Sequence, residues 1–362
     1  MPAYNRAMKS TPSAAAGPVA TGKIPAAAPG KNPEAAGDQS RATFAIELFG
    51  RRYRLAAEDR AFWTKVAAGA WERDTLRFFA RALDGRRGRD GPGGRDSSGG
   101  RDGSGGRDGS GAPDADSVCV DVGAWIGATA LFAAPMCRTV YALEPDPAAY
   151  ERLLANLRMN AAANIVPCHA ALTAADGRVC LSNHRHFGNS MTRAQAATGD
   201  AAGDISRHPR SLLSGGGAGD ISRHPRSLLS GGGAGAGENG DGDIGGNRAT
   251  VLGMRLASFI AWWGIARIDL LKIDIEGGEF ALLPALLELP ARLRPVVHLS
   301  LHAPFFPAAE RAGKLAAVAE LAAQYAHLYD QNNARITARD ITQNPAYRDK
   351  FQVVAMSERA LF

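Results

Sequence analysis

The segment from Asp121 to Gly127, with the sequence DVGAWIG, decides the fold of this chain. It follows the short apolar run VCV and leads into ATALFAAPM, which has a helical pattern. A tight turn between a strand and a helix brings backbone close to a ligand, and Gly123 and Gly127 lack the side chains that would block this approach. Their spacing is G-x-x-x-G, unlike the G-x-G-x-x-G pattern that holds a dinucleotide pyrophosphate. The motif therefore argues against NAD and FAD.

An acidic residue closes the next apolar run, TVYALEP. Glu144 stands 23 residues after Asp121, where Rossmann-type sheets place a carboxylate that accepts hydrogen bonds from both ribose hydroxyls. Pro145 and Pro147 shape the turn into the amphipathic helix expected for PAAYERLLANLRMNA. A glycine turn alone is a weak signal, because any tight turn can use glycine. Together with Glu144 it predicts an adenosine-containing ligand that is recognised without a pyrophosphate.

Strand and helix patterns alternate along the rest of the chain. The runs NIVPCHAAL, IDLLKIDIEG, RPVVHLSLHAPFF, AHLYDQ and FQVVAMS predict strands, and LASFIAWWGI, EFALLPALLEL and PAAERAGKLAAVAELAAQY predict helices. Residues 42–83 predict two short strands around a Phe49–Gly50 turn, followed by helix with a break at Gly69. This order is typical of an α/β fold with a mostly parallel sheet and helices on both faces.

Three low-complexity stretches interrupt the folded part. Residues 1–41 are rich in Ala, Pro, Gly and Lys and predict a disordered tail, and the repeats in 84–116 predict a flexible linker. Within 195–248 the sequence GDISRHPRSLLSGGGA occurs twice in succession. A disordered insertion is expected there, because solenoids need about three copies that each bury an apolar face. The main domain is then expected over 117–362, with 42–83 as its N-terminal cap.

Composition excludes several classes of protein. The net charge is +6, but no Lys/Arg cluster is interleaved with aromatic residues, so nucleic-acid binding is not expected. The four cysteines show neither a C-x-x-C pair nor zinc-finger spacing, and we expect them to be reduced. No apolar run approaches the roughly 18 residues of a membrane span. A cytoplasmic protein is expected, and the sequence gives no information on its oligomeric state.

Three ordered motifs, DVGAWIG, YALEPDPAAYERLLANLRMN and LLKIDIEGGE, resemble those of the FkbM family of methyltransferases. WERDT at 71–75 also resembles the family. The resemblance covers about residues 42 to 358, apart from the low-complexity stretches. It implies a Rossmann-like class I methyltransferase fold, with a seven-stranded, mostly parallel sheet whose last strand is antiparallel. It also implies S-adenosylmethionine as methyl donor and O-methylation of a hydroxyl on a glycan or a secondary metabolite.

The resemblance also implies positions for the cofactor. Asp121, Gly123 and Gly127 would border the methionine half of S-adenosylmethionine, and the ribose would lie at Glu144. Trp125 departs from the family, in which Asn is the commoner residue. Asn can contact the amino-acid part of the cofactor, whereas Trp can only pack or donate its ring N–H. We count Trp125 among the expected cofactor-binding residues.

The segment IDLLKIDIEGGE predicts a cluster of ionisable groups, because side chains alternate along a strand. Lys272, Asp274 and Glu276 would share one face, where charges are costly unless they are paired or functional. One interpretation is a Lys272–Asp274 ion pair that fixes the end of the strand. The other places Asp274 and Glu276 at the carboxyl end of the sheet, where ligands bind in such folds. All three residues are candidates for the chemistry.

The adjacent strand, in the family topology, is RPVVHLSLHAPFF, on which His298, Ser300 and His302 share a face. His302 lies nearest the carboxyl end. A sugar-type hydroxyl is barely ionised at pH 7, so methyl transfer to it needs a general base or a metal. We expect Asp274, Glu276 or His302 to take up the proton. A Mg²⁺ ion held by Asp274 and Glu276 is an alternative.

Further alternatives concern one loop and the overall function. HRHFGNSMTR at 184–193 resembles a family loop that lines the active site. Its Arg185, His186 and Arg193 either contact the acceptor or are surface charges. A cofactor-binding protein without catalysis, or a degenerate methyltransferase, is the second functional hypothesis, because of Trp125 and the insertions. A nicotinamide-dependent oxidoreductase is the third, and the missing glycine fingerprint disfavours it.

Overall fold

The structure is a computed structural model that describes residues 42–48, 50–83, 117–182, 192–196, 248–290 and 294–362. The expected tail and linker lie outside these residues. So do 197–247, the main part of the expected insertion, and Arg185 and His186 of the expected active-site loop.

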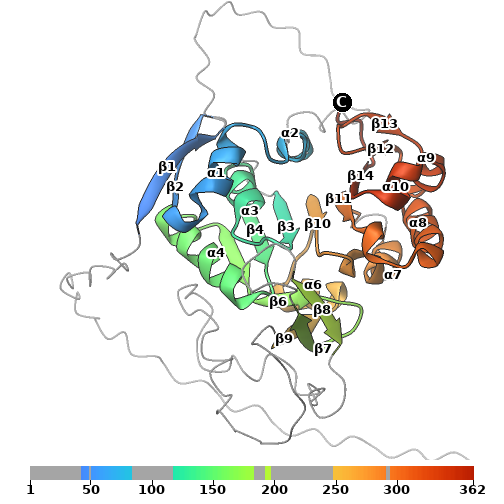
Figure 1. Cartoon of the computed structure of the whole chain (residues 1–362), viewed down its shortest axis with the longest axis horizontal. Helices are drawn as coiled ribbons and strands as arrows, with labels where there is room; N and C mark the ends of the chain where they lie inside the picture. The colour runs from blue at the N-terminus through green and yellow to red at the C-terminus, as the bar shows by residue number, and fades with distance from the viewer. Residues whose placement is uncertain (1–41, 49, 84–116, 183–191, 197–247, 291–293) are drawn as a thin grey trace, which may run out of the picture. The chain divides into compact units, whose positions relative to one another are not determined.

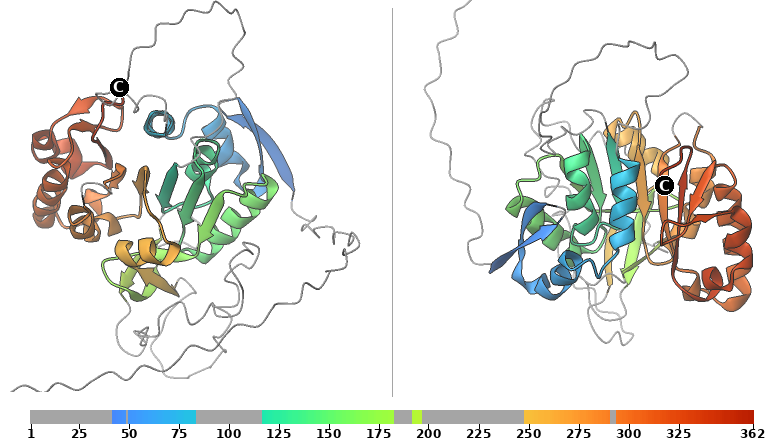
Figure 2. Two further views of the ribbon diagram at one scale, coloured as in Figure 1. Left: turned by 180° about the vertical axis from the view of Figure 1, so that it is seen from behind. Right: turned by 90° about the horizontal axis from the view of Figure 1, so that it is seen from above.

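The largest sheet has eight strands in the order β13-β12-β14-β11-β10-β3-β4-β5 (Figure 1). Their bounds are β3 Val118–Val122, β4 Thr139–Leu143, β5 Ile165–Cys168, β10 Leu270–Ile273, β11 Val296–Leu301, β12 His327–Tyr329, β13 Arg335–Ile336 and β14 Gln352–Ser357. The strands from β11 to β5 in this order pair in parallel, and Figure 2 shows β10, β3 and β4 side by side. The predicted α/β class with a mostly parallel sheet is confirmed.

The antiparallel part of the sheet lies at its other end. The last strand, β14, runs antiparallel to both β11 and β12. The short strand β13 then folds back on β12, so the described sheet has one strand more than the seven expected. Two residues of strand carry too little periodicity to be found in a sequence.

Alternate residues of the central strands belong to two separate apolar cores, as expected for a sheet buried on both faces. Val120 and Leu271 pack with apolar residues of α6, α7 and α8, while Cys119 and Leu270 pack with those of α3 and α4. The described α-helices that follow β3 in the sequence are α3 Ala128–Ala133, α4 Pro147–Met159, α6 Leu256–Trp263, α7 Leu283–Leu287, α8 Ala308–Ala322, α9 Ala338–Gln343 and α10 Pro345–Asp349. Among the described residues, no helix is long and apolar enough to cross a membrane.

Residues 42–83, here called the N-terminal segment, contain the predicted hairpin and helices. Strands β1 (Thr43–Leu48) and β2 (Arg51–Ala56) pair antiparallel and are followed by α1 (Arg60–Ala67) and α2 (Arg73–Ala82). The large buried apolar side chains of this segment belong to the same core as those of α3 and α4.

A second sheet was largely missed by the sequence patterns. Its order is β6-β9-β7-β8, with bounds β6 Ala170–Leu172, β7 Gly177–Ser182, β8 Arg193–Ala196 and β9 Arg248–Met254. β7 pairs with β9 although the low-complexity stretch separates them in sequence, so no local turn signal marks the pair. β8 ends at Ala196 and β9 begins at Arg248, so the outermost residues of the expected insertion, 195, 196 and 248, lie in strands.

Candidate active site

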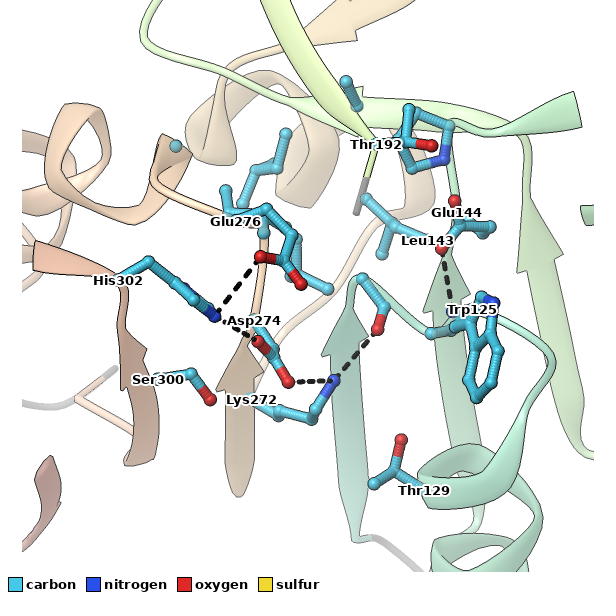
Figure 3. Close-up of a pocket in the computed structure, with 18 of the residues that line it drawn as sticks. Trp125, Thr129, Leu143, Glu144, Thr192, Lys272, Asp274, Glu276, Ser300 and His302 are labelled. Atoms are coloured by element: carbon cyan, nitrogen blue, oxygen red, sulfur yellow. Dashed lines mark hydrogen bonds and ion pairs between the residues drawn. The ribbon is translucent and has the colours of Figure 1, made fainter. Parts of the chain in front are cut away.

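A cavity of about 1050 Å³ opens at the carboxyl ends of the central parallel strands (Figure 3). Its wall includes Gly123 after β3, Glu144 after β4, Asp274 and Glu276 after β10, and His302 after β11. Open α/β sheets bind ligands at this edge. The volume lies slightly above the roughly 300–1,000 Å³ range of ligand pockets, so there is room for more than one small molecule.

Close packing against β10 requires a glycine at position 123, which the motif alone does not reveal. Its φ is +78°, and a Cβ there would lie 1.9 Å from the backbone oxygen of Asp274. The amide of Asp274 in turn donates to the carbonyl of Val122, so the ends of β3 and β10 meet at this point. Gly127 serves a different contact, because a Cβ there would lie 2.7 Å from Leu153 Cδ1 on α4. Of the two glycines, Gly123 lines the cavity and Gly127 lies behind it.

Glu144 is buried at the end of β4 and receives two backbone N–H groups. Its Oε2 accepts from Trp125 N at 2.7 Å, and its Oε1 accepts from Asp146 N at 2.8 Å. Burial raises the pKa of Glu144 to about 7, although these two hydrogen bonds act in the opposite direction. The carboxylate faces the cavity from the position that the sequence predicted.

Trp125 adopts a left-handed backbone conformation, with φ of 48°. Asn, the residue expected from the family resemblance at this position, tolerates the left-handed region better than most residues and therefore suits this turn. The Trp125 ring packs edge-on against Phe62 of α1, with ring centroids 4.6 Å apart. Both residues line the cavity, so this side chain joins the glycine turn to the N-terminal segment.

Lys272 is buried, and its main partner is not the one that the sequence indicated. Its Nζ lies 3.0 Å from Asp121 Oδ1, donates to Gly123 O at 2.9 Å and is 3.8 Å from Asp274 Oδ2. Asp121 also accepts a hydrogen bond from Thr129 and is completely buried behind the cavity wall. Burial disfavours the charge of Lys272, but Asp121 and Asp274 outweigh this effect and raise its pKa. A protonated Lys272 cannot act as a base, so we assign it the fixing of these carboxylates.

His302 lies just beyond β11, with carboxylates at both ring nitrogens. Nδ1 is 3.2 Å from Oε1 of Glu279, which also accepts from the backbone N of His302 at 2.7 Å. The other oxygen of Glu279 accepts from Gly277 N at 2.8 Å, so this fully buried carboxylate is held firmly. Nε2 lies 3.6 Å from both Asp274 Oδ1 and Glu276 Oε2 (Figure 3). The imidazole therefore has one nitrogen fixed and one directed to the cavity.

The surroundings of this cluster raise the pKa values of both His302 and Glu276. Burial lowers the pKa of His302, but the hydrogen bond and charge of Glu279, with the charges of Asp274 and Glu276, raise it overall. Burial raises the pKa of Glu276 to about 7, although His302 opposes this change. Glu276 can therefore gain or lose a proton close to pH 7, and His302 is shifted toward its protonated form.

Two further carboxylates of the site were not among the expected residues. Glu279 follows the strand motif and is the direct partner of His302. Glu72, in the WERDT stretch, lines the cavity from the N-terminal segment. The Glu72 side chain is open to solvent within the cavity, and desolvation by the surrounding protein, with the nearby charge of Asp274, raises its pKa to about 7. The resemblance of WERDT to the family was the available signal for Glu72, whereas Glu279 could be found only from its contacts.

The histidines of the β11 segment have different environments. Ser300 and His302 line the cavity, whereas His298 is buried among Phe78 and Phe79, with centroid distances of 5.5 and 5.7 Å. Burial lowers the pKa of His298 to about 4, so it is neutral at pH 7. His298 belongs to the packing of the sheet against α2.

The expectation of a magnesium site gains no support. Over the part of the chain that the structure describes, no group of three or more His, Cys, Asp or Glu side chains is arranged to hold a metal ion.

The comparisons agree with this geometry. A family model described as the methyltransferase FkbM domain matches residues 121–329, which is more than half of the 362-residue chain. The matched range contains the glycine turn, Glu144, Lys272, the Asp274–Glu279 segment and His302. Comparison with curated proteins gives no match. The chain belongs to the FkbM methyltransferase family.

Proposed function

We propose that this methyltransferase uses S-adenosylmethionine and methylates a hydroxyl oxygen of a glycan or a secondary metabolite. One observation carries the proposal. Glu279 fixes the imidazole of His302 so that Nε2 faces the cavity beside Asp274 and Glu276. A hydroxyl acceptor needs such a positioned base, because it is barely ionised at neutral pH.

The residues at the ends of β3 and β4 fit the methyl donor. The left-handed turn at Gly123 exposes backbone to the cavity. Each oxygen of Glu144 keeps acceptor capacity beyond its one backbone N–H, which suits the two ribose hydroxyls. The carboxylates of Glu72, Asp274 and Glu276 line the same cavity and favour a positively charged sulfonium. When bound, S-adenosylmethionine would supply an electrophilic methyl group.

Side chains of the protein then take up the proton of the acceptor hydroxyl. Neutral His302 accepts the hydroxyl proton at Nε2, while its Nδ1–H stays bonded to Glu279. The carboxylates of Asp274 and Glu276, each 3.6 Å from Nε2, stabilise the imidazolium that forms. Lys272 remains protonated and holds Asp121 and Asp274 in place.

A cofactor-binding protein without catalysis is the second candidate, because Trp125 stands where the family more often has Asn. Isothermal titration with S-adenosylmethionine, beside transfer of a labelled methyl group to cell-extract glycans and metabolites, separates the two candidates. Binding without transfer to any extract would favour the second. The nicotinamide-dependent alternative loses its basis, because the matched family is one of methyltransferases.

Substitution of His302 by Ala and of Asp274 by Asn tests the assigned roles. We expect His302→Ala to lower kcat by about 10²–10⁴-fold while cofactor affinity is kept, because a positioned base contributes this much. His327→Ala is a matched control, because this histidine lies on β12, where it contacts Arg335. Unchanged turnover in both site variants would remove the catalytic assignment. Activity should survive EDTA, which checks the absence of a metal step.

A further inference from the structure

The imidazole of His302 packs against two aromatic rings. The ring of Phe305, in the short helix η8 (Ala303–Phe305), lies within 7° of parallel to the imidazole, with ring centroids 5.5 Å apart. The ring of Phe351 packs at an angle against both, with centroid distances of 5.2 Å to His302 and 5.0 Å to Phe305. The contact of Nδ1 with Glu279 fixes one atom of the imidazole, whereas the stacking on Phe305 fixes the plane of the ring.

Phe305 is in turn covered by Arg193 of β8. The guanidinium carbon Cζ of Arg193 lies 4.1 Å from the centre of the Phe305 ring, which is the geometry of a cation–π contact. Neither residue lines the cavity, whereas Thr192 and Ala194, the neighbours of Arg193 in sequence, do. Because successive side chains of a strand point to opposite faces, Arg193 lies behind the cavity wall. It is therefore placed to act on the residues of the site and not on a ligand.

The strand that carries Arg193 is anchored at this point. Arg193 pairs with Ser182 of β7, and the hydroxyl of Thr192 donates to Oδ2 of Asp146. Asp146 is completely buried, and its other oxygen accepts from two backbone N–H groups at the start of α4. The position of the guanidinium is therefore fixed relative to the main sheet.

Glu276 is the carboxylate of the site that is least supported by hydrogen bonds. Its Oε2 is buried without a hydrogen-bond partner among the described residues, and lies 3.6 Å from Nε2 of His302. Its backbone is left-handed, with φ of 52°, and such strain in a residue other than glycine is typical of functional sites. Nε of Arg193 is also buried without a hydrogen-bond partner in the described part of the chain. A carboxylate without donors needs a nearby positive charge to stay ionised.

Four charged groups from different elements act on Glu276. Asp274 after β10 and Glu279 in η6 (Gly278–Ala281) raise its pKa, whereas His302 after β11 and Arg193 of β8 lower it. A histidine that is about to accept a proton is neutral and carries no charge. In that state Arg193 is the only cation among these four groups, and an arginine keeps its charge at every relevant pH.

We propose that Arg193 is a positioning residue of the site. Through Phe305 it holds the plane of His302, and its charge keeps Glu276 ionised beside Nε2 until the proton arrives. The ionised Glu276 then stabilises the imidazolium that His302 becomes. This inference rests on the O-methyltransferase function proposed above, since that function gives His302 its role as base.

The charge effect is tested by carbon-13 NMR of the glutamate carboxyl groups in the full-length protein. The signal of Glu276 is assigned with Glu276→Gln, and its titration is followed against pH. Arg193→Met removes the charge and keeps an unbranched side chain, so the titration midpoint of Glu276 should move to higher pH by about half a unit or more. Arg193→Lys keeps the charge and should leave the midpoint near that of the wild type.

Arg60→Met is the matched control for the charge effect. Arg60 covers Phe44 in the same way, with Cζ 4.6 Å from the centre of the ring, and neither residue lines the cavity. The midpoint of Glu276 should not move in this variant. An unmoved midpoint in Arg193→Met, or an equal movement in Arg60→Met, would overturn the proposal.

The stacking is tested by nitrogen-15 NMR of the His302 ring, which follows the exchange of the Nδ1 hydrogen with water. Phe305→Ala frees the plane of the ring, so this hydrogen should exchange about two- to tenfold faster. Phe305→Tyr keeps an aromatic face and should restore the slow exchange, and Phe44→Ala is the control. Equal exchange rates in the wild type and in Phe305→Ala would overturn the part assigned to Phe305.

Activity gives a separate readout, because both NMR experiments need neither donor nor acceptor. In Arg193→Met less Glu276 is ionised at pH 7, so the transfer of a labelled methyl group to cell-extract acceptors should slow by about three- to tenfold and recover as the pH rises. A loss that persists at high pH would contradict the assigned charge effect. Absence of transfer in the wild type would count against the proposed function, while the effect of Arg193 on Glu276 would still be measured by NMR.

Discussion

The imidazole of His302 depends on one buried carboxylate for its orientation. Glu279 bonds both the backbone and Nδ1 of His302, and is itself bonded by Gly277 N. A carboxylate acceptor requires that Nδ1 carry the hydrogen, which leaves the lone pair on Nε2. In the proposed mechanism, Glu279 is thus a positioning residue that acts on the acceptor through His302.

Replacement of Glu279 by Gln should shift the pH dependence of turnover. Gln keeps an oxygen for Nδ1–H but removes the charge that raises the pKa of His302, so this pKa should fall. His302 accepts a proton only when neutral, so kcat rises with pH through this pKa. The rising limb should therefore move to lower pH, with a plateau lower by about a hundredfold. Profiles of kcat against pH measure this. Exposed Glu288→Gln is the control, and an unmoved limb in Glu279→Gln would contradict the assignment.

Replacement of Gly123 by Ala should lower the free energy of unfolding by more than the positive φ of this residue alone predicts. The new Cβ would lie 1.9 Å from Asp274 O and push the ends of β3 and β10 apart. Gly264→Ala is the matched control, because Gly264 has φ of +61° with no atom within 4 Å of the added Cβ, and it should cost only about 1–2 kcal/mol. Urea unfolding and cofactor titration measure both variants. Equal losses would show that the strand ends tolerate separation.

At this scale the sequence predicted the polar groups of the site but not their partners. Glu144, Asp274, Glu276 and His302 meet at the cavity, because carboxyl ends of parallel strands share one edge of the sheet. Asp121 and Gly127 belong to the glycine motif, but neither lines the cavity. Asp121 pairs with Lys272, and Gly127 leaves room for Leu153 of α4. Pairings between distant segments, such as Glu279 with His302, depend on tertiary geometry that no local pattern encodes.

Among the elements, α4 links the N-terminal segment to the cofactor turn. Asn156 is fully buried; its Oδ1 accepts from Ala56 N after β2, and its Nδ2 donates to Ile126 O within the glycine turn. One side chain of α4 therefore satisfies backbone groups of two other segments. Asn160, one turn later, bonds Arg54 at a solvent-exposed position.

Replacement of Asn156 by Leu should destabilise the protein by about 2–5 kcal/mol. It leaves the N–H of Ala56 and the carbonyl of Ile126 unpaired, and each buried group costs about 1–3 kcal/mol. Asn160→Ala removes contacts that water can replace, so its loss should be smaller. Chemical unfolding of both variants measures the difference. Comparable losses would mean that Asn156 adds nothing beyond a surface contact.

Prediction of elements succeeded where an apolar run coincides with one buried strand. β3, β4, β10, β11 and β14 were found in this way, since central strands are apolar on both faces. β7, β8 and β9 were missed, because their pairing spans the low-complexity stretch and β8 has only four residues. Helices α9 and α10 are six and five residues long, too short to establish a helical period.

At the scale of the whole molecule, the N-terminal segment is part of the main core. Leu55, Trp63, Phe78 and Phe79 are almost completely buried and share a cluster with residues of α3 and α4. Arg359 also donates to Ala82 O, which joins the C-terminal residues to α2. Residues 42–362 accordingly form one compact unit.

Deletion of residues 1–116 should therefore prevent folding rather than yield a smaller enzyme. Each large core side chain contributes about 1.5–3 kcal/mol, so these four are comparable with the roughly 5–15 kcal/mol stability of a domain. Deletion of 1–41 alone is the control and should leave the melting temperature unchanged. Circular dichroism and thermal melts compare the two truncations. Cooperative melting of the 117–362 chain would contradict this prediction.

The backbone contact between Gly123 and Asp274 has a consequence for the order of events. The turn proposed to bind the donor and the carboxylate beside the proposed base share one junction, so we expect a ligand that orders one side to reduce the freedom of the other. We therefore expect donor and acceptor binding to be thermodynamically linked. Linkage is reciprocal, so the factor by which the donor raises the affinity for the acceptor equals the factor by which the acceptor raises the affinity for the donor. We expect the ternary complex to be more populated than independent sites would allow, and the spent donor to loosen once the methylated product leaves.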